Sequence, residues 1–472
     1  LSTEKGSSTL FIRLLNQNDK GEALAQRIAA LREGLADEDV YAVNPKSFRQ
    51  VPNTPFCYWV SERIRWLFKE LSPFESDGRT VKQGLATADD FRFVRVWWEV
   101  PAERILDSGR CTVSSGQEKP EQKWTDERIR EFQAWCRKRT YEGKRWAPFA
   151  KGGEYSPYYA DIHLVVNWEN EGAEIRNFVD PKTGKINSRP QNTDYYFRPG
   201  LTWSDRTNKD FGPRPMQAGT IISVKGSGGF AAHDILWGML GLMCSRFFIS
   251  MMDLIVGSTT LAKSYQVGTI GRVPTFNATL LDTAIAAAAK RCHDLRRASM
   301  ALHETERTFL GCLRASGAES LSAIHAATQT EQTSVAQDVV QCQNLIDDKT
   351  FSLCGITSLD RASLRQGVLG SPLADSTVND TQEMASTEED KEDLNSIRLS
   401  YDGTTSDVMS FAFGSVLGRW DTSIARGERQ PSPLSDPFDP LPVCPPGMLQ
   451  GPDGLPAKPE DVPSDYPIRI DW

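Results

Sequence analysis

Between residues 146 and 230, cationic and planar side chains alternate in a way that suits contact with nucleic acid. An arginine can pair bidentately with a guanine edge or a phosphate, and an aromatic ring can stack or wedge against a base. The side chains able to do this are Lys151, Tyr155, Tyr158, Tyr159, Arg189, Tyr195, Tyr196, Arg198, Trp203, Arg206, Arg214 and Lys225. Aromatic residues at β-spacing are more often core residues, so a structural interpretation stays open beside the binding one.

A basic run just before this stretch has two interpretations. It consists of Arg137, Lys138, Arg139, Lys144 and Arg145 within a segment of helical spacing. Such a run is usually a solvated helix face, but its position also suits a helix that rests on a nucleic-acid backbone. The sequence favours neither.

The residue types needed for metal binding and for nucleophilic catalysis are scattered. Nine cysteines form no CxxC pair, and the five histidines do not lie at ligand spacing to them, so we expect no metal site. The odd number of cysteines, several in helical or apolar contexts, predicts reduced thiols and a cytoplasmic protein.

Two short patterns resemble cofactor or catalytic motifs without matching them. Gly226, Ser227, Gly228 and Gly229 have neither GxGxxG nor Walker spacing, so they predict a tight turn after a strand. Asn44, Pro45 and Phe48 resemble the NPP(Y/F) loop of amino-methyltransferases, but the second proline and the adjacent aromatic residue are missing. No GxSxG context is present. We therefore assign no catalytic residue to this chain.

Hydrophobic periodicity indicates how these residues are positioned. Helical spacing recurs at residues 10–35, 56–71, 124–145, 235–256, 278–315 and 319–352. Residues rich in aromatic and β-branched types predict strands within 81–100, 162–168, 195–197, 201–203 and 220–224. The fold class is therefore predicted as α+β, with a β-rich domain at 81–275 after a helical segment at 1–80. A helical region at 276–430 and a Pro-rich tail at 431–472 follow, and the acidic segment 377–396 is expected to be mobile.

The charge is divided unevenly along the 472 residues, whose net charge is −8. Residues 1–275 hold 38 Lys and Arg against 33 Asp and Glu, which gives +5; residues 276–472 hold 16 against 29, which gives −13. Ten of the twelve tryptophans also lie before residue 275, so the first part is the one suited to phosphates and bases. The longest apolar run, 235–256, contains Arg246 and Asp253, so no membrane segment is expected.

Several blocks of the chain resemble one known family. These blocks are VNPKSFRQVPNTPFCYWVS, KQGLATADDFRFVRVWWEV, PFAKGGEYSPYY, VNWENEG, YYFRPGLTWSDRT, SYQVGTIGRVP, FAFGSVLGRW and DPFDPLPVCPPGML, and they span residues 40 to 450. They resemble the region downstream of the catalytic domain in large adenine-specific DNA methyltransferases of phage-defence systems. These enzymes are of the BREX and DISARM types, related to the Eco57I and TaqI class. In one block the family's QGxxTGDN pattern is altered, because Ala88 and Asp90 replace the second glycine and the asparagine.

The resemblance implies that the chain is the DNA target-recognition part of such an enzyme. Its partner would be double-stranded DNA, and S-adenosylmethionine would bind not here but in a catalytic domain expected upstream of Leu1. Other phage-defence proteins are further expected partners. The DNA-binding residues implied are Lys151, Tyr158, Tyr159, Arg189, Tyr195, Arg198, Trp203, Arg206, Arg214 and Lys225. Two alternatives remain: a stand-alone DNA-specificity subunit, and a protein-interaction scaffold without catalysis.

Overall fold

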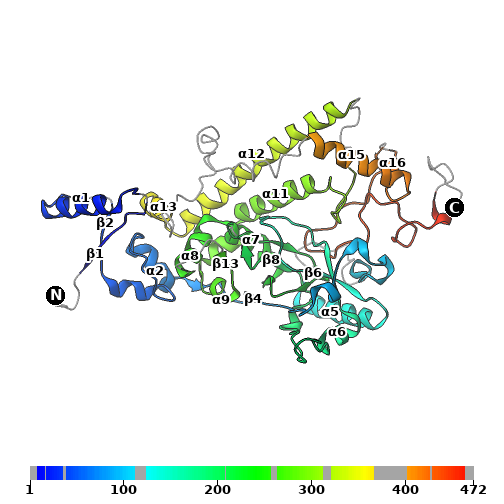
Figure 1. Ribbon diagram of the computed structural model, residues 1–472, viewed down its shortest axis with the longest axis horizontal. Coiled ribbons are helices and arrows are strands. Elements are labelled where there is room, and N and C mark those ends of the chain that lie inside the picture. The colour runs from blue at the N-terminus through cyan, green and yellow to red at the C-terminus, as the bar shows by residue number, and fades with distance from the viewer. Residues whose placement is uncertain are drawn as a thin grey trace.

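The computed structural model of the protein describes residues 8–15, 17–35, 39–111, 124–207, 209–256, 263–311, 320–365, 401–425 and 428–462. Helices lie beside several small sheets, which confirms the α+β class (Figure 1). The acidic segment predicted at 377–396 lies outside the described residues.

The N-terminal part contains a two-stranded antiparallel sheet as well as helices. Strand β1 (Thr9–Ile12) pairs antiparallel with β2 (Val40–Val43), and helix α1 (Lys20–Arg32) lies between them in the chain. The helical spacing over 10–35 therefore predicts α1 correctly but not β1, whose backbone groups pair with a strand about thirty residues away. Two further elements follow, η1 (Pro45–Gln50) and α2 (Glu62–Glu70).

Two four-stranded sheets form the centre of the β-rich part. The first has the order β10-β8-β12-β4 and is antiparallel throughout. Its strands are β4 (Thr80–Lys82), β8 (Gly200–Ser204), β10 (Arg214–Met216) and β12 (Gly226–Phe230). The second has the order β11-β6-β7-β5, with strands β5 (Val94–Val96), β6 (Trp146–Ala150), β7 (Leu164–Asn167) and β11 (Ile221–Ile222). Strands near 162–168, 201–203 and 220–224 are thus confirmed.

The glycine run at 226–229 is a strand, so the turn predicted there is wrong. It forms most of β12, which lies between β8 and β4. A Cβ atom at Gly226 would lie 2.5 Å from the carbonyl oxygen of Ala150, and one at Gly228 would lie 2.7 Å from the ring of Phe230. Gly226 is needed because the backbone at the end of β6 packs directly on it, and Gly228 because the ring of Phe230 lies over it.

Two of the predicted strand segments are helical instead. Residues 90–93 form α3 (Asp90–Phe93), since the side chain of Asp89 accepts a hydrogen bond from the backbone N–H of Arg92 at 3.0 Å. Residues 193–195 form η5 (Thr193–Tyr195), so the strand expected at 195–197 is absent from this described stretch. The remaining short elements are η2 (Trp97–Glu99), η3 (Ala102–Arg104), η4 (Ser108–Arg110), β3 (Ser72–Pro73), β9 (Arg206–Thr207), β13 (Lys263–Ser264) and β14 (Pro274–Thr275).

Helices cover the sheets and continue beyond them. Beside and between the strands lie α5 (Asp126–Tyr141), α6 (Glu169–Arg176), η6 (His233–Ile235), α7 (Leu236–Cys244), α8 (Arg246–Val256), α9 (Val267–Ile270) and α10 (Asn277–Leu281). The later helices are α11 (Thr283–Met300), α12 (Leu321–Leu353), α13 (Ser358–Arg365), α15 (Tyr401–Val416), α16 (Thr422–Ala425) and η8 (Pro459–Asp461). The helices expected over 124–145, 235–256 and 319–352 are confirmed, the second as two helices that break at Ser245.

The helices after residue 276 share a core with the β-rich part. The largest buried cluster joins side chains of β8, α7, α8, α11 and α12 with side chains from the N-terminal part, such as Val43 and Phe48. In Figure 1, α12 runs along the upper side with α11 beneath it, over α7 and β8. No single described helix is long and apolar enough to cross a membrane. The segments His233–Cys244 and Arg246–Val256 together have the length and composition of a membrane span, but they are bent by 63° relative to each other. The boundaries predicted at 80, 275 and 430 stay predictions.

Candidate nucleic-acid interface

The loop at residues 83–90 joins segments that are far apart in the sequence. The N–H of Leu85 donates to the carbonyl of Ile222 at 2.9 Å, and the N–H of Val224 donates to the carbonyl of Leu85 at 3.1 Å. On its other side, Ala86 and Arg189 exchange backbone hydrogen bonds of 3.0 and 2.9 Å. The loop therefore brings the turn before β12 and the segment of Arg189 to one place.

At two positions of the 83–90 loop, the backbone conformation or its surroundings favour glycine over any residue with a Cβ atom. A Cβ atom at Gly84 would lie 2.0 Å from the carbonyl oxygen of Ile222, so only glycine allows this approach. Ala88 has a φ of 64°, in the left-handed region that favours glycine. The QGxxTGDN pattern has glycine at both positions, and its second glycine is the one replaced here.

An ion pair connects the loop to the end of β6. The ammonium group of Lys151 pairs with the carboxylate of Asp90, which also accepts a hydrogen bond from the hydroxyl of Thr87. Partial burial acts to raise the pKa of Asp90, but the hydrogen bonds from Lys151 and Thr87 prevail and hold it below its usual value. Where the family pattern has asparagine, this chain has a carboxylate that fixes Lys151.

Lys151 lies beside two other cations at the same end of the sheet. A Cβ atom at Gly152 would lie 2.7 Å from the carbonyl oxygen of Lys225, so the loop after β6 packs on the turn before β12. The N–H of Asp205 donates to the same carbonyl at 2.9 Å, and Arg206 follows directly. The backbone of the exposed Arg189 is joined to the same end through Ala86, and we call these four residues the cation cluster: Lys151, Arg189, Arg206 and Lys225.

A half-buried aromatic ring, Tyr195, lies in the segment that follows Arg189. The ring of Tyr195 lies against Phe230, with centroids 4.9 Å apart, and the charged groups of Lys82 and Arg198 lie 5.7 and 5.9 Å from its centroid. Its segment is tied to the 83–90 loop because the side-chain amide of Asn192 donates to the carbonyl of Gln83 at 2.8 Å. Arg198 pairs with Asp126 of α5 at 3.0 Å.

Four of the residues assigned to DNA contact are buried instead of lying on this surface. The hydroxyl of Tyr158 donates to the side chain of Gln343 in α12, and the indole N–H of Trp203 donates to the carbonyl of Tyr265 at 3.0 Å. The hydroxyl of Tyr159 donates to Glu306 at 3.2 Å. Burial lowers the pKa of the Arg214 guanidinium to about 10. In this structure these side chains hold the fold together and do not reach a ligand at the surface.

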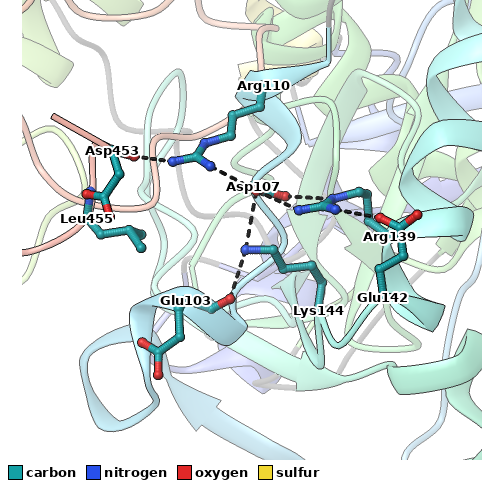
Figure 2. A network of polar contacts seen from close by, with 8 residues as sticks. All are labelled: Glu103, Asp107, Arg110, Arg139, Glu142, Lys144, Asp453 and Leu455. Carbon is teal, nitrogen blue, oxygen red and sulfur yellow. Dashed lines mark hydrogen bonds and ion pairs between the residues drawn. The ribbon is translucent and has the colours of Figure 1, made fainter.

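The basic run at the end of α5 is largely neutralised by acidic partners. Arg139 donates two hydrogen bonds to the buried carboxylate of Asp107, at 3.2 and 3.0 Å, and Lys144 lies 3.3 Å from it (Figure 2). Burial acts to raise the pKa of Asp107, but Arg139 and Lys144 hold it below its usual value. The other pairs of the run are Arg137 with Glu171, Lys138 with Glu142, and Arg145 with Glu174. This arrangement favours the structural interpretation of the run.

The same carboxylate connects the C-terminal segment to the β-rich part. Arg110 lies 3.8 Å from Asp107 and donates to the backbone carbonyl of Asp453, as Figure 2 shows. Sequence reasoning gave no role to Lys82, Asp90 or Asp107. The first two lie within the block that carries the altered QGxxTGDN pattern, which is the signal that points to them.

Comparison with known proteins confirms the resemblance to adenine-specific methyltransferases. The chain is 27% identical over 236 residues to the adenine-specific methyltransferase PglX of Lacticaseibacillus casei, covering 50% of this chain and 17% of that protein. It is 22% identical over 306 residues to the adenine-specific methyltransferase BrxX of Escherichia coli, covering 64% of this chain and 20% of that protein. The chain thus spans about a fifth of these relatives. No family model matches.

Proposed function

We propose that this chain is the DNA-recognition part of an adenine-N6 DNA methyltransferase of a phage-defence system of the BREX or DISARM type. The observation that carries the proposal is the cation cluster, because segments far apart in the sequence bring Lys151, Arg189, Arg206 and Lys225 to one end of the sheet. Cations gathered on one surface are what a nucleic-acid backbone requires. The similarity to PglX and BrxX supports adenine methylation as the reaction that this recognition would serve.

Within the cation cluster, the exposed side chains are assigned to DNA and the paired ones to positioning. Arg189, Arg206 and Lys225 are exposed. They are assigned to phosphates and base edges. Lys151 is held by Asp90, and Arg198, which lies beside Tyr195, is held by Asp126, so these two cations are assigned to positioning. The described cysteines are free thiols, which supports a cytoplasmic location.

Methyl transfer from S-adenosylmethionine is assigned to a separate catalytic domain, as a partner of this chain. The glycine-rich run of the described residues does not fit the cofactor. Gly226–Gly229 is paired on both sides as β12, the backbone of Ala150 and Gly152 lies against Gly226, and the ring of Phe230 lies against Gly228, so no phosphate or adenosyl group fits against this run.

A salt-dependent binding assay on the whole chain with duplex DNA tests the proposal. The variant R189Q/R206Q/K225Q is expected to bind at least tenfold more weakly, and the slope of log affinity against log salt is expected to fall by about two to three units. The matched control is K20Q/R32Q/K46Q, which removes three exposed cations, two from α1, at the far left of Figure 1, and one from η1. Equal affinity and slope for both variants would contradict the proposal, as would a wild-type chain that does not bind duplex DNA at low salt.

A further inference from the structure

Phe91 is the most exposed large apolar side chain among the described residues. Its side chain is 89% exposed, and it follows directly after Asp90, the residue that pairs with Lys151 of the cation cluster. Leaving a phenylalanine in water forgoes the favourable free energy of burying its ring. A position so close to the cation cluster therefore suggests that the ring is buried when a ligand binds.

The backbone around Phe91 is held in place on both sides. Before it, Asp90 is fixed by Lys151 and Thr87, and Asp89 caps the first turn of α3. After it, the guanidinium of Arg95 donates to the carbonyl of Phe91 and, at 2.7 Å, to the carbonyl of Val94. The exposed ring is thus presented by an ordered turn, and little conformational entropy is lost when it is buried.

The surroundings of Phe91 suit a nucleic acid better than a protein core. The Arg95 guanidinium lies 5.6 Å from the ring centroid, and the next residue, Arg92, is 53% exposed and pairs with Glu174 at 2.9 Å. DNA-bending proteins insert an apolar side chain between base pairs while neighbouring cations hold the phosphates. An exposed ring on an ordered turn, with Arg95 against it and the cation cluster nearby, has this combination.

We propose that Phe91 inserts into a base step of the bound duplex and partly unstacks it. The inference rests on the proposed function and extends it, since it names a side chain that contacts bases. Unstacking costs a few kcal/mol per step, and the buried ring and the phosphate contacts allowed by the bend offset this cost. Phe91 would therefore favour flexible pyrimidine–purine steps.

Fluorescence of 2-aminopurine, which rises when the base loses its stacking, tests the insertion. The probe is an alternating dA·dT duplex with 2-aminopurine at several adenine positions. Binding of the wild-type chain is expected to raise the fluorescence. The variant F91A is expected to abolish the rise and to bind about tenfold more weakly with an unchanged salt slope, since no charge is removed. The variant F91W is expected to keep both effects.

The control is F413A, which removes another exposed phenylalanine, from α15 and away from the cation cluster (Figure 1). Both alanine variants are expected to unfold at the wild-type temperature, because neither ring is buried. If the wild-type chain does not bind the duplex, the proposed function fails. If it binds but F91A matches F413A in affinity and fluorescence, the insertion is refuted, and Phe91 is then a contact for a protein partner.

Discussion

The buried guanidinium of Arg214 donates a hydrogen bond to the carbonyl oxygen of Gly152 at 3.2 Å. It lies directly beneath the loop that carries Lys151, and a Cβ atom at Gly153 would be 4.0 Å from the same guanidinium. A cation inside the protein therefore supports a cation of the surface cluster. Arg214 and Arg206 lie on neighbouring segments but have different roles, structural for the buried one and ligand contact for the exposed one.

The variant R214A is expected to lose stability, and R206A is not. Removing Arg214 leaves a cavity and breaks its hydrogen bonds to carbonyl groups, which costs about 2–3 kcal/mol of unfolding free energy. Removing the exposed Arg206 changes this free energy by at most about 0.5 kcal/mol but lowers the salt slope of DNA binding by about one unit. Urea unfolding and salt titration measure the two effects. An unfolding free energy in R214A equal to that of the wild type would contradict the structural role.

The variant A88G is expected to stabilise the protein by about 0.5–1 kcal/mol. Ala88 has a φ of 64°, and glycine adopts this conformation without the steric cost that a Cβ atom brings. Ala25→Gly in the exposed part of α1 serves as the control, since glycine within a helix costs about 1 kcal/mol. Changes of opposite sign in the midpoint of urea unfolding are expected. A loss of stability in both variants would show that Ala88 is unstrained.

The variant D107N is expected to destabilise the protein by about 3 kcal/mol at neutral pH. Asparagine has the shape of aspartate but leaves Arg139 and Lys144 without their buried counter-charge. The difference from wild type is expected to shrink as the pH falls through the lowered pKa of Asp107, because the protonated acid resembles the amide. The exposed pair Arg291 and Asp338 provides the control, since D338N is expected to cost at most about 1 kcal/mol.

The variant E306Q is expected to have the opposite pH dependence. Burial and the nearby Asp161 raise the pKa of Glu306 to about 9, so the folded state holds this carboxyl protonated while the unfolded chain ionises it above its usual pKa of 4.5. Glu306 therefore lowers stability progressively between these two pH values. Glutamine removes this effect, so E306Q is expected to gain on the order of 1–3 kcal/mol over wild type at pH 8 and less at pH 5. Thermal unfolding at both pH values tests this, and an equal effect at both would refute it.

Much of the fold could be predicted from local patterns, but the direction of the side chains could not. Helices such as α5 and α12 follow from their spacing and caps. In contrast, alternating aromatic residues do not reveal whether they face solvent or core when both faces of a sheet are covered. Trp203 of β8 is buried for this reason, whereas Tyr158 lies in the loop between β6 and β7 and is buried against α12, a contact that no local pattern indicates.

The DNA-binding role of the cations stays a prediction, but their exposure can be compared with it. Arg189, Arg206 and Lys225 are exposed, and of the four cations only Lys151 and Arg206 lie in the blocks that resemble the methyltransferases. What local patterns could not give is close packing between distant segments. The segment 226–229 is a strand because it pairs with β8 and β4, and Gly226 and Gly228 are needed in it because Ala150 and Phe230 leave no room there for a Cβ atom, although glycine usually disfavours strands.

The hydrogen bond from Tyr158 to Gln343 joins positions 185 residues apart. A contact of such sequence separation forms late, because the intervening chain must be ordered first. During synthesis, the segments carrying Lys151 and Lys225 would emerge well before α12, which completes their core. The recognition surface is therefore expected to acquire its final shape only once α12 has been translated, which delays DNA binding by the nascent chain.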